Sequence, residues 1–271
     1  MELHPFVKWV GGKRQLITEI QKRMPKQFNN YYEPFVGGGA ILLAIQPQKA
    51  FINDINDVLI NAFEIVKKSP KELVDMLQIM DHFSISKDDY YYFRDLFNQK
   101  LLNQELDLFN AALFIYLNKR CFNGLYRVNS KGLFNVPFNN KAKIQSADPE
   151  NLLKLSQFLQ NVQITNVDFE EAVKDAQPGD FIFFDSPYAP LKATSFDSYT
   201  KEGFSYDDHV RLSSVFKKLD QKGCFVMITN NNTDLIQELY KDYKIEVLQT
   251  KRLINSKGDK RAGEELIITN Y

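Results

Sequence analysis

Cysteine and histidine are scarce in this sequence, and their number and spacing argue against metal and disulfide sites. The two cysteines, Cys121 and Cys224, form no metal-spaced pair and no disulfide framework, so we expect both to be small buried residues in a reducing compartment. The three histidines, His4, His82 and His209, are scattered and lie close to neither cysteine. A metal site is therefore not expected.

Long apolar runs and a net charge are also missing. No stretch approaches the roughly 18 uninterrupted apolar residues that a membrane helix needs, and residues 1–14 lack the apolar core of a signal peptide. The chain has 34 basic and 34 acidic side chains, so its net charge does not indicate a nucleic-acid partner. With 271 residues, we expect a cytoplasmic globular protein with one core, or one core and a smaller inserted module.

Acidic residues are absent from Leu117 to Ala147, and this local absence says more than the net charge. Basic groups interleaved with aromatic rings are what a phosphate backbone and unstacked bases require. An ordinary solvated face is the alternative. The stretch contains the basic residues Lys119, Arg120, Arg127, Lys131, Lys141 and Lys143 and the aromatic residues Phe122, Tyr126, Phe134 and Phe138.

The two ends of the chain alternate between helix-like and strand-like patterns. A strand over 30–36 meets three glycines and a helix over 40–45, and a short strand over 50–53 then ends at Asp54. This order of elements is half of a doubly wound nucleotide-binding sheet. A helix is also predicted over 11–25, and further strands over 162–167, 180–184, 224–229, 244–249 and 266–269.

The middle of the chain has mostly helical patterns, with an irregular or hairpin segment at 122–138. Helices are predicted from Ser69-Pro70 onward and over 88–102, 106–119 and 149–160. The sequence therefore predicts an α/β catalytic domain over 1–57 and 160–271. A mainly helical domain over 58–159 interrupts it.

The glycine-rich segment follows the first predicted strand. Its glycines allow positive φ angles and let the backbone approach a bound ligand closely. Asp54 ends the next strand, where a carboxylate can accept hydrogen bonds from ribose hydroxyls. A dinucleotide fingerprint fits badly because Leu42 stands where its third glycine belongs. An adenosine cofactor without a pyrophosphate is therefore favoured, and a purely structural turn is the alternative.

The tetrapeptide Asp185-Ser186-Pro187-Tyr188 follows the very apolar segment 181–184, so it is expected at the carboxyl end of a central strand. A carboxylate and a main-chain carbonyl there could accept both hydrogens of a planar amine such as adenine N6, localising its lone pair. Tyr188 would offer a ring for stacking on an extruded base. An ordinary turn after a buried strand is the alternative.

Five segments together resemble the Dam-type (D12 class, alpha-group) N6-adenine DNA methyltransferases. They are PFVKWVGGK at 5–13, EPFVGGGA at 33–40, NDIN at 53–56, FNGLYRVNSKGLFNVPF at 122–138 and DSPY at 185–188. The matches cover essentially the whole chain and occur in the family's order. The resemblance implies a Rossmann-like S-adenosylmethionine-dependent methyltransferase sheet with an inserted, mainly helical target-recognition domain, whose hairpin is near 122–138.

The resemblance also assigns roles to residues. Catalysis would involve Asp185, Ser186, Pro187 and Tyr188. S-adenosylmethionine would bind Trp9, Lys13, Glu33, Pro34, Phe35, Gly37, Gly39, Asp54, Asp168, Phe169 and Asp185, with Asp54 on the ribose and Asp168 and Phe169 at the adenine. DNA would contact Lys8, Phe122, Asn123, Leu125, Arg127 and Pro137, with Phe122 as a wedge and the last three residues at base edges.

Site-specific methylation of duplex DNA by base flipping is the function that the resemblance implies, with S-adenosylhomocysteine as product. Among recognition sequences, the resemblance of the hairpin favours GATC. Two departures are visible: Ser186 replaces the first proline of the usual DPPY, and Asn139-Asn140-Lys141 replaces a glycine, a basic residue and a tyrosine. The first removes rigidity but keeps the acting groups, so we expect an active enzyme. The second leaves the stringency of the site open.

Two alternatives remain open at this stage. The same catalytic domain could act on RNA or on a protein amide, or the chain could bind DNA after losing catalysis. Neither cysteine follows a proline, which disfavours the thiol chemistry of cytosine-C5 methylation. We expect a monomeric, metal-free, nucleoid-associated protein of a bacterium or phage. The sequence leaves open whether a companion restriction endonuclease exists. A second basic cluster near the C-terminus consists of Lys251, Arg252, Lys257, Lys260 and Arg261. Contact with phosphates and an ordinary surface loop are equally good interpretations of it.

Overall fold

The structure is a computed structural model that describes residues 2–9, 11, 13, 15–83, 86–140, 144–190, 203–251 and 262–271. The chain forms two compact units. Unit 1 comprises Met1–Arg14, Val36–Gln46 and Asn53–Asn166, and unit 2 comprises Gln15–Phe35, Pro47–Ile52 and Val167–Tyr271. Each unit is described by itself below. The assignment of residues 58–159 to DNA recognition stays a prediction.

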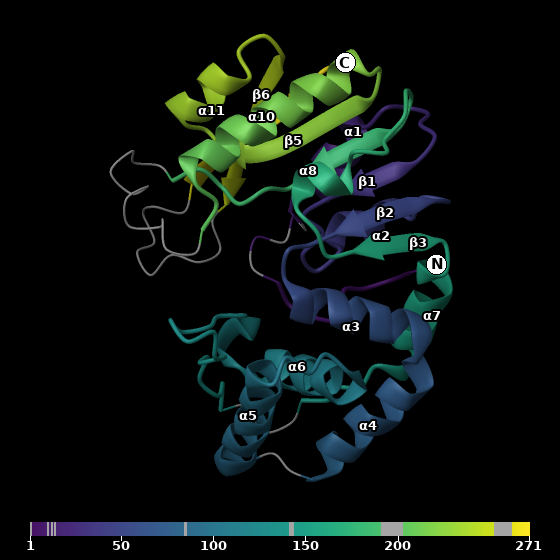
Figure 1. Cartoon of the computed structure of the whole chain (residues 1–271), viewed down its shortest axis with the longest axis vertical. Helices are drawn as coiled ribbons and strands as arrows, with labels where there is room; N and C mark the ends of the chain where they lie inside the picture. The colour runs from purple at the N-terminus through teal and green to yellow at the C-terminus, as the bar shows by residue number, and fades with distance from the viewer. Residues whose placement is uncertain are drawn as a thin grey trace. The chain divides into compact units, whose positions relative to one another are not determined.

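The described strands form a seven-stranded sheet in the order β3-β2-β1-β4-β5-β7-β6 (Figure 1). β1 pairs in parallel with β2 and β4, and β4 pairs in parallel with β5, whereas β7 is antiparallel to both β5 and β6. This topology confirms the predicted Rossmann-like α/β class. The strands are β1 (Tyr31–Glu33), β2 (Ala50–Asn53), β3 (Val162–Thr165), β4 (Phe181–Phe184), β5 (Phe225–Asn231), β6 (Lys244–Lys251) and β7 (Ala262–Thr269).

Unit 2 is built on the middle of this sheet. Every residue of β4 is buried, which explains its unbroken apolar sequence, because helices or loops cover a central parallel strand on both faces. α10 (Tyr206–Gln221) packs against β5, and Figure 1 shows it running along that strand. Its N-terminus carries a capping box formed by Ser205 and Asp208. The other described helices of unit 2 are α1 (Ile17–Arg23), α8 (Phe169–Ala172) and α11 (Asp234–Leu239).

The helix predicted over 11–25 is shorter in the structure, where α1 occupies only Ile17–Arg23. Gly11 has a φ of 82°, a left-handed conformation that a right-handed helix does not contain. The Lys13 ammonium then donates to the Gly11 carbonyl at 3.1 Å and holds this turn. The apolar spacing alone could not reveal a glycine in this conformation.

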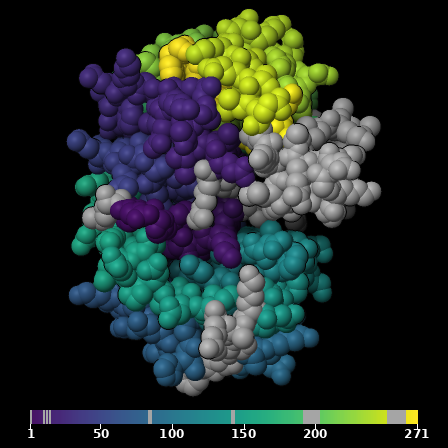
Figure 2. All heavy atoms as spheres, turned by 180° about the vertical axis from the view of Figure 1, so that it is seen from behind, coloured from purple at the N-terminus to yellow at the C-terminus, as the bar shows by residue number. Residues whose placement is uncertain are grey.

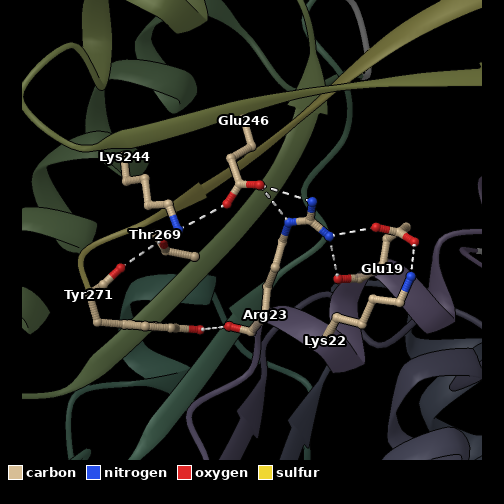
Figure 3. A network of polar contacts seen from close by, with 7 residues as sticks. All are labelled: Glu19, Lys22, Arg23, Lys244, Glu246, Thr269 and Tyr271. Atoms are coloured by element: carbon tan, nitrogen blue, oxygen red, sulfur yellow. Dashed lines mark hydrogen bonds and ion pairs between the residues drawn. The ribbon is translucent and has the colours of Figure 1, made fainter.

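α1 is joined to the C-terminal strands by a polar network that surrounds Arg23 (Figure 3). The Arg23 guanidinium donates to Glu246 on β6 at 2.9 Å and to Glu19 at 2.6 Å. The Tyr271 hydroxyl donates to the Arg23 carbonyl at 2.9 Å. Figure 2 shows the purple N-terminal surface of unit 2 bordering the yellow-green surface of the C-terminal strands.

Unit 1 is mainly helical in its described residues. α6 is buried along most of its length, and α3, α4 and α5 all pack against it. Asp107 caps α6 and Asp148 caps α7, each accepting a hydrogen bond from a main-chain amide of the first turn. The helices are α2 (Ala40–Ile45), α3 (Asp57–Lys68), α4 (Pro70–Phe83), α5 (Lys87–Leu102), α6 (Leu108–Arg120), the short 3₁₀ helix η1 (Phe122–Gly124) and α7 (Pro149–Leu159).

The segment 122–138 is an irregular hairpin, as the sequence predicts. Two isolated antiparallel bridges join Cys121 to Phe138 and Val128 to Phe134. Asn98 on α5 holds the hairpin by accepting from the Phe134 amide at 2.8 Å and donating to its carbonyl at 3.1 Å. No helix in the described part of the chain is long and apolar enough to cross a membrane.

Candidate active site

Asp185 is the first residue after the buried strand β4 of unit 2. Its Oδ1 accepts a hydrogen bond of 3.0 Å from the Thr229 hydroxyl on the neighbouring strand β5. The two strands are parallel, with Phe184 opposite Ile228, so Asp185 and Thr229 both lie at the carboxyl edge of the sheet. The predicted catalytic carboxylate is therefore held at the edge where open α/β sheets bind ligands.

The other three residues of the tetrapeptide differ in exposure. Ser186 is buried and its Oγ accepts a hydrogen bond of 3.4 Å from the Asn230 side chain, whereas Pro187 is exposed. The Tyr188 hydroxyl donates to Glu265 on β7 at 2.6 Å. Burial and the nearby carboxylates of Asp185 and Glu265 raise the pKa of Tyr188, so its phenol stays protonated and neutral at physiological pH.

A buried tyrosine in β1 of unit 2 bonds the residue that ends this strand. Tyr31 begins β1, and its hydroxyl donates at 2.9 Å to Glu33, the last residue of β1; both residues are buried. Burial, then the charge and hydrogen bond of Glu33, and also the charge of Asp185, raise the pKa of Tyr31. Glu33 and Asp185 therefore act electrostatically on the same phenol, which places the predicted cofactor residue Glu33 in the neighbourhood of the predicted catalytic carboxylate.

Phe35 and Phe169 form an aromatic cluster in unit 2, with ring centroids 5.5 Å apart. Arg211 on α10 lies 4.2 Å from the centroid of Phe169 and forms two hydrogen bonds of 2.8 Å with Asp168. Burial raises the pKa of Asp168, but the Arg211 guanidinium and the Glu170 amide outweigh it and hold the pKa below its usual value. Flat rings beside a fixed carboxylate suit an adenine ring and its amino group. Pro34, which precedes Phe35, is buried.

The glycine turn belongs to unit 1. Gly37 has a φ of 48° and Gly39 a φ of 74°, and Gly39 is the N-cap of α2. A Cβ added at Gly37 would lie 2.7 Å from Cδ1 of Trp9, so the indole lies directly against the turn. Only glycine fits here on both grounds, conformation and space. Trp9 in turn stacks on Tyr126, with centroids 5.7 Å apart.

Asp54 organises the same turn. Its Oδ2 accepts from the Gly37 amide and its Oδ1 from the Asn56 amide, each at 3.0 Å. Burial raises the pKa of Asp54, and the two amide hydrogen bonds oppose that rise. Each carboxylate oxygen can accept more than one hydrogen bond, so Asp54 can hold the turn and still accept from a ligand hydroxyl. Lys13, also in unit 1, is buried.

The predicted DNA-reading residues share unit 1 with this turn. Asn118 connects two of their segments, because its side chain bonds both the amide and the carbonyl of Lys8, at 2.8 and 2.9 Å, and also the Gly124 carbonyl at 3.0 Å. Phe122 is 52% exposed although it is a large aromatic residue. Lys8, Asn123, Arg127 and Pro137 are also exposed, and Leu125 is half-buried.

Arg120, one of the basic residues of the stretch expected to bind phosphates, does not fit that expectation. Arg120 is only 2% exposed and donates to Asp81 at 2.7 Å, so it cannot reach a phosphate. It also bonds Ser146 and the Ile144 carbonyl and lies over the Tyr116 ring. Lys141 and Lys143 lie outside the described residues, as do Arg252, Lys257, Lys260 and Arg261 of the second basic cluster.

Both cysteines are buried, and burial raises the pKa of each thiol to about 11. A thiol of this kind is protonated at neutral pH and is a poor nucleophile. The sequence-based expectation that both cysteines are buried is confirmed, and their raised pKa agrees with the argument against thiol chemistry. Within the described residues, no group of three or more His, Cys, Asp or Glu side chains is arranged to hold a metal ion.

Asn230, Asn231 and Arg211 were not anticipated as site residues. Asn230 and Asn231 follow the apolar run of β5, at the same sheet edge as Asp185, and both bond the main chain of Ala189. Polar residues directly after a buried parallel strand were the available signal. Arg211 had no comparable signal, because a surface helix contains many exposed basic residues.

The sequence is similar to one family of known proteins along most of its length. Residues 9–254 match the family model described as D12 class N6 adenine-specific DNA methyltransferase. Two curated relatives are the Type II methyltransferase M1.LlaDCHI of Lactococcus lactis subsp. cremoris, 44% identical over 100% of this chain and 96% of the relative, and the Type II methyltransferase M.MjaIII of Methanocaldococcus jannaschii, 41% identical over 100% of both chains. The DNA adenine methylase of Escherichia coli is 32% identical over 98% of this chain and 94% of its own.

These similarities extend over the tetrapeptide, the glycine turn and the hairpin described above. Together with the sheet topology and the carboxylate at its edge, they leave one assignment. The chain belongs to the D12 class of N6 adenine-specific DNA methyltransferases.

Proposed function

We propose that this enzyme transfers a methyl group from S-adenosylmethionine to N6 of an adenine flipped out of duplex DNA. The products are S-adenosylhomocysteine, N6-methyladenine and the proton that N6 releases. The N6 lone pair is delocalised into the purine ring and is a poor nucleophile. Acceptors that bind both N6 hydrogens as the bond to the methyl carbon forms lower this barrier. Direct transfer requires no thiol adduct, in agreement with the raised pKa of both cysteines.

The observation that carries this proposal is the placement of Asp185. Its carboxylate follows a wholly buried strand, and the Thr229 hydroxyl fixes one oxygen at 3.0 Å. Asp185 would accept one N6 hydrogen and the main-chain oxygen of Ser186 the other. Tyr188, kept neutral by burial and by two carboxylates, would stack on the extruded base as an uncharged ring.

The cofactor assignments follow the chemistry of each group. Phe35, Phe169 and Asp168 would bind the adenine, because the two rings are flat apolar surfaces and the carboxylate is fixed by Arg211. Asp54 would accept from the ribose hydroxyls, since its carboxylate is already oriented by two amides. The other proposed contacts to the cofactor, including those to its amino-acid part, would come from the glycine turn and the residues around it. These are Trp9, Lys13, Glu33, Pro34, Gly37 and Gly39.

The DNA contacts would come from Lys8 and the hairpin. Phe122 is the exposed aromatic residue that would fill the space of the flipped base, and Arg127 would read a guanine edge through its guanidinium. Leu125 and Pro137 would contact a thymine methyl, and Asn123, the exposed middle residue of η1, would also contact DNA. We propose GATC as the recognition sequence.

Two other functions use the same fold. RNA or a protein amide could receive the methyl group, or the chain could bind DNA without catalysis. The exposed aromatic and basic residues of the hairpin favour duplex DNA. The intact Asp185 and Asp54 favour catalysis.

Methyl transfer from labelled S-adenosylmethionine separates these functions. We expect label in duplex DNA, and none in RNA or protein, with every labelled adenine of a plasmid in GATC. Label in RNA or protein alone would contradict the substrate, and label at another sequence would contradict GATC only. Binding of both ligands without transfer would identify a protein that has lost catalysis.

The wider setting is also a proposal. Two relatives bear the name Type II methyltransferase, so we propose a restriction endonuclease of the same specificity as a companion. The enzyme would act as a monomer on the nucleoid of a bacterium, or on the DNA of a phage that infects one.

A further inference from the structure

Asn230 is wholly buried and its side chain contacts both ends of the turn that contains the tetrapeptide. Its Oδ1 accepts from the Ala189 amide at 2.9 Å and from its own neighbour, the Asn231 amide, at 2.9 Å. Its Nδ2 donates to the Ser186 hydroxyl at 3.4 Å. A single amide group thus connects the second residue of the tetrapeptide to the residue that follows it.

The register of two strands explains why Asn230 is in this place. β4 ends at Phe184, opposite Ile228, whereas β5 continues to Asn231. The three polar residues that end β5 therefore lie beside the chain that follows β4. Thr229 holds the Asp185 carboxylate at 3.0 Å, and the Asn231 side chain donates to the Ala189 carbonyl at 2.9 Å.

Ser186 gives this contact a particular meaning. Its side chain is 2% exposed, and a buried hydroxyl needs a hydrogen-bond partner. Serine leaves the backbone φ angle free, whereas proline at the same position would fix φ near −65° but would offer no group to Asn230. The orientation of the Ser186 carbonyl, which the proposed function uses as an acceptor, then depends on Pro187, which restricts ψ of Ser186, and on the contacts to the Ser186 side chain and to Ala189.

We propose that Asn230 is a positioning residue that fixes the main chain of Asp185 and Ser186 through the Ser186 hydroxyl, in place of the rigidity that a proline ring would supply. The inference rests on the proposed function. Because Asn230 is wholly buried, the proposed role includes no direct contact with the methyl group or the adenine. Its effect should therefore appear in kcat rather than in the affinity for cofactor or DNA.

A double-mutant cycle tests this role. Asn230→Ala and Ser186→Pro are made singly and together, and kcat, KM and the Kd of S-adenosylhomocysteine are measured with a GATC duplex. We expect Asn230→Ala to lower kcat by about tenfold or more in the parent chain, with the Kd unchanged. In the Ser186→Pro background, Asn230→Ala should lower kcat less. The two fold-losses should differ by about two- to tenfold, which is the effect of one hydrogen bond.

Asn232→Ala is the matched control. Asn232 follows the same strand but bonds the exposed Glu264 at 2.7 Å, so its loss should leave kcat and the Kd unchanged. If Asn230→Ala does not fold, Ser186→Ala removes the same hydrogen bond with one oxygen atom. Ser186→Ala should lower kcat by about two- to tenfold, whereas Ser186→Pro, which supplies the ring's rigidity at the same position, should not.

The outcomes separate this inference from the function on which it rests. A parent chain that transfers no methyl group to DNA overturns both. A parent chain that is active, with equal factors for Asn230→Ala in the serine and proline backgrounds, overturns the positioning role alone. A rise in the Kd of S-adenosylhomocysteine that accounts for the whole loss would also overturn it.

Discussion

At the scale of single residues, Trp9 offers a direct reporter of cofactor binding. It is the only tryptophan of the chain, and its indole lies against Gly37 and stacks on Tyr126. We expect S-adenosylhomocysteine to change the emission of Trp9 in a saturable titration. Trp9→Phe should abolish the signal. A parent chain that binds the cofactor in calorimetry without any change in emission would contradict the contact.

Gly37 is the residue at which the turn tolerates no side chain. Gly37→Ala combines a positive φ with a Cβ at 2.7 Å from Trp9, so we expect the Kd of S-adenosylhomocysteine to rise by at least about tenfold. Gly132 is the matched control, because its φ is 73° and nothing lies within 4 Å of an added Cβ. Gly132→Ala should have the same backbone strain without the loss of affinity. An equal rise in Kd for both variants would show that backbone strain, and not the contact with Trp9, lowers the affinity.

His209 gives the stability a defined pH dependence. It is 1% exposed and packs against Phe204, and burial lowers its pKa to about 4. Between that value and the ordinary value of 6.5, the unfolded chain binds a proton that the folded chain does not. The free energy of unfolding should therefore fall as the pH decreases through this window, by an amount on the order of 3 kcal/mol from this group.

The measurement is urea unfolding at several values between pH 7 and pH 4, for the parent and for His209→Gln. The variant should have a flatter pH profile, whatever its absolute stability. Identical slopes would mean that other groups cause the acid sensitivity.

At the scale of secondary-structure elements, two arginines join helices to other segments in different ways. Arg120 on α6 is 2% exposed and pairs with Asp81 of α4, which is 16% exposed, whereas Arg23 on α1 is 20% exposed and pairs with Glu246. Arg120→Met removes a buried charge-assisted hydrogen bond and leaves Asp81 with two backbone amides, so it should destabilise the protein by about 2 kcal/mol. Arg23→Met should cost about 1 kcal/mol or less. Urea unfolding gives both free-energy losses. A loss for Arg120→Met no larger than that for Arg23→Met would contradict the greater contribution assigned to the Arg120–Asp81 pair.

The same elements show what the sequence could predict and what it could not. The strand over 181–184 and the glycine turn could be placed from apolar runs and glycines, because these signals are local. The burial of Arg120 depends on Asp81, 39 residues earlier, and the contact of Asn230 with Ser186 depends on the register of two strands that are distant in sequence. Both required the folded chain. Local spacing also extended α1 too far, since it does not reveal the left-handed Gly11.

At the scale of the whole molecule, the parallel strands determine where chemistry can occur. The carboxyl ends of β1, β4 and β5 present Glu33, Asp185 and Thr229 at one edge of the sheet. The covered interior keeps these strands rigid, and the polar residues that follow them can differ without loss of the fold. This separation is consistent with a tetrapeptide in which serine replaces proline while its neighbours hold the main chain.

Single-turnover methyl transfer by Asp185→Ala tests the central claim most directly. The variant is first saturated with the duplex, and an excess of labelled S-adenosylmethionine then starts a single turnover. The observed rate therefore excludes DNA binding and product release. We predict loss of transfer by at least about a thousandfold, with the Kd values for DNA and S-adenosylhomocysteine within about threefold of the parent. Transfer at the parental rate would contradict the claim that this carboxylate activates the adenine amine.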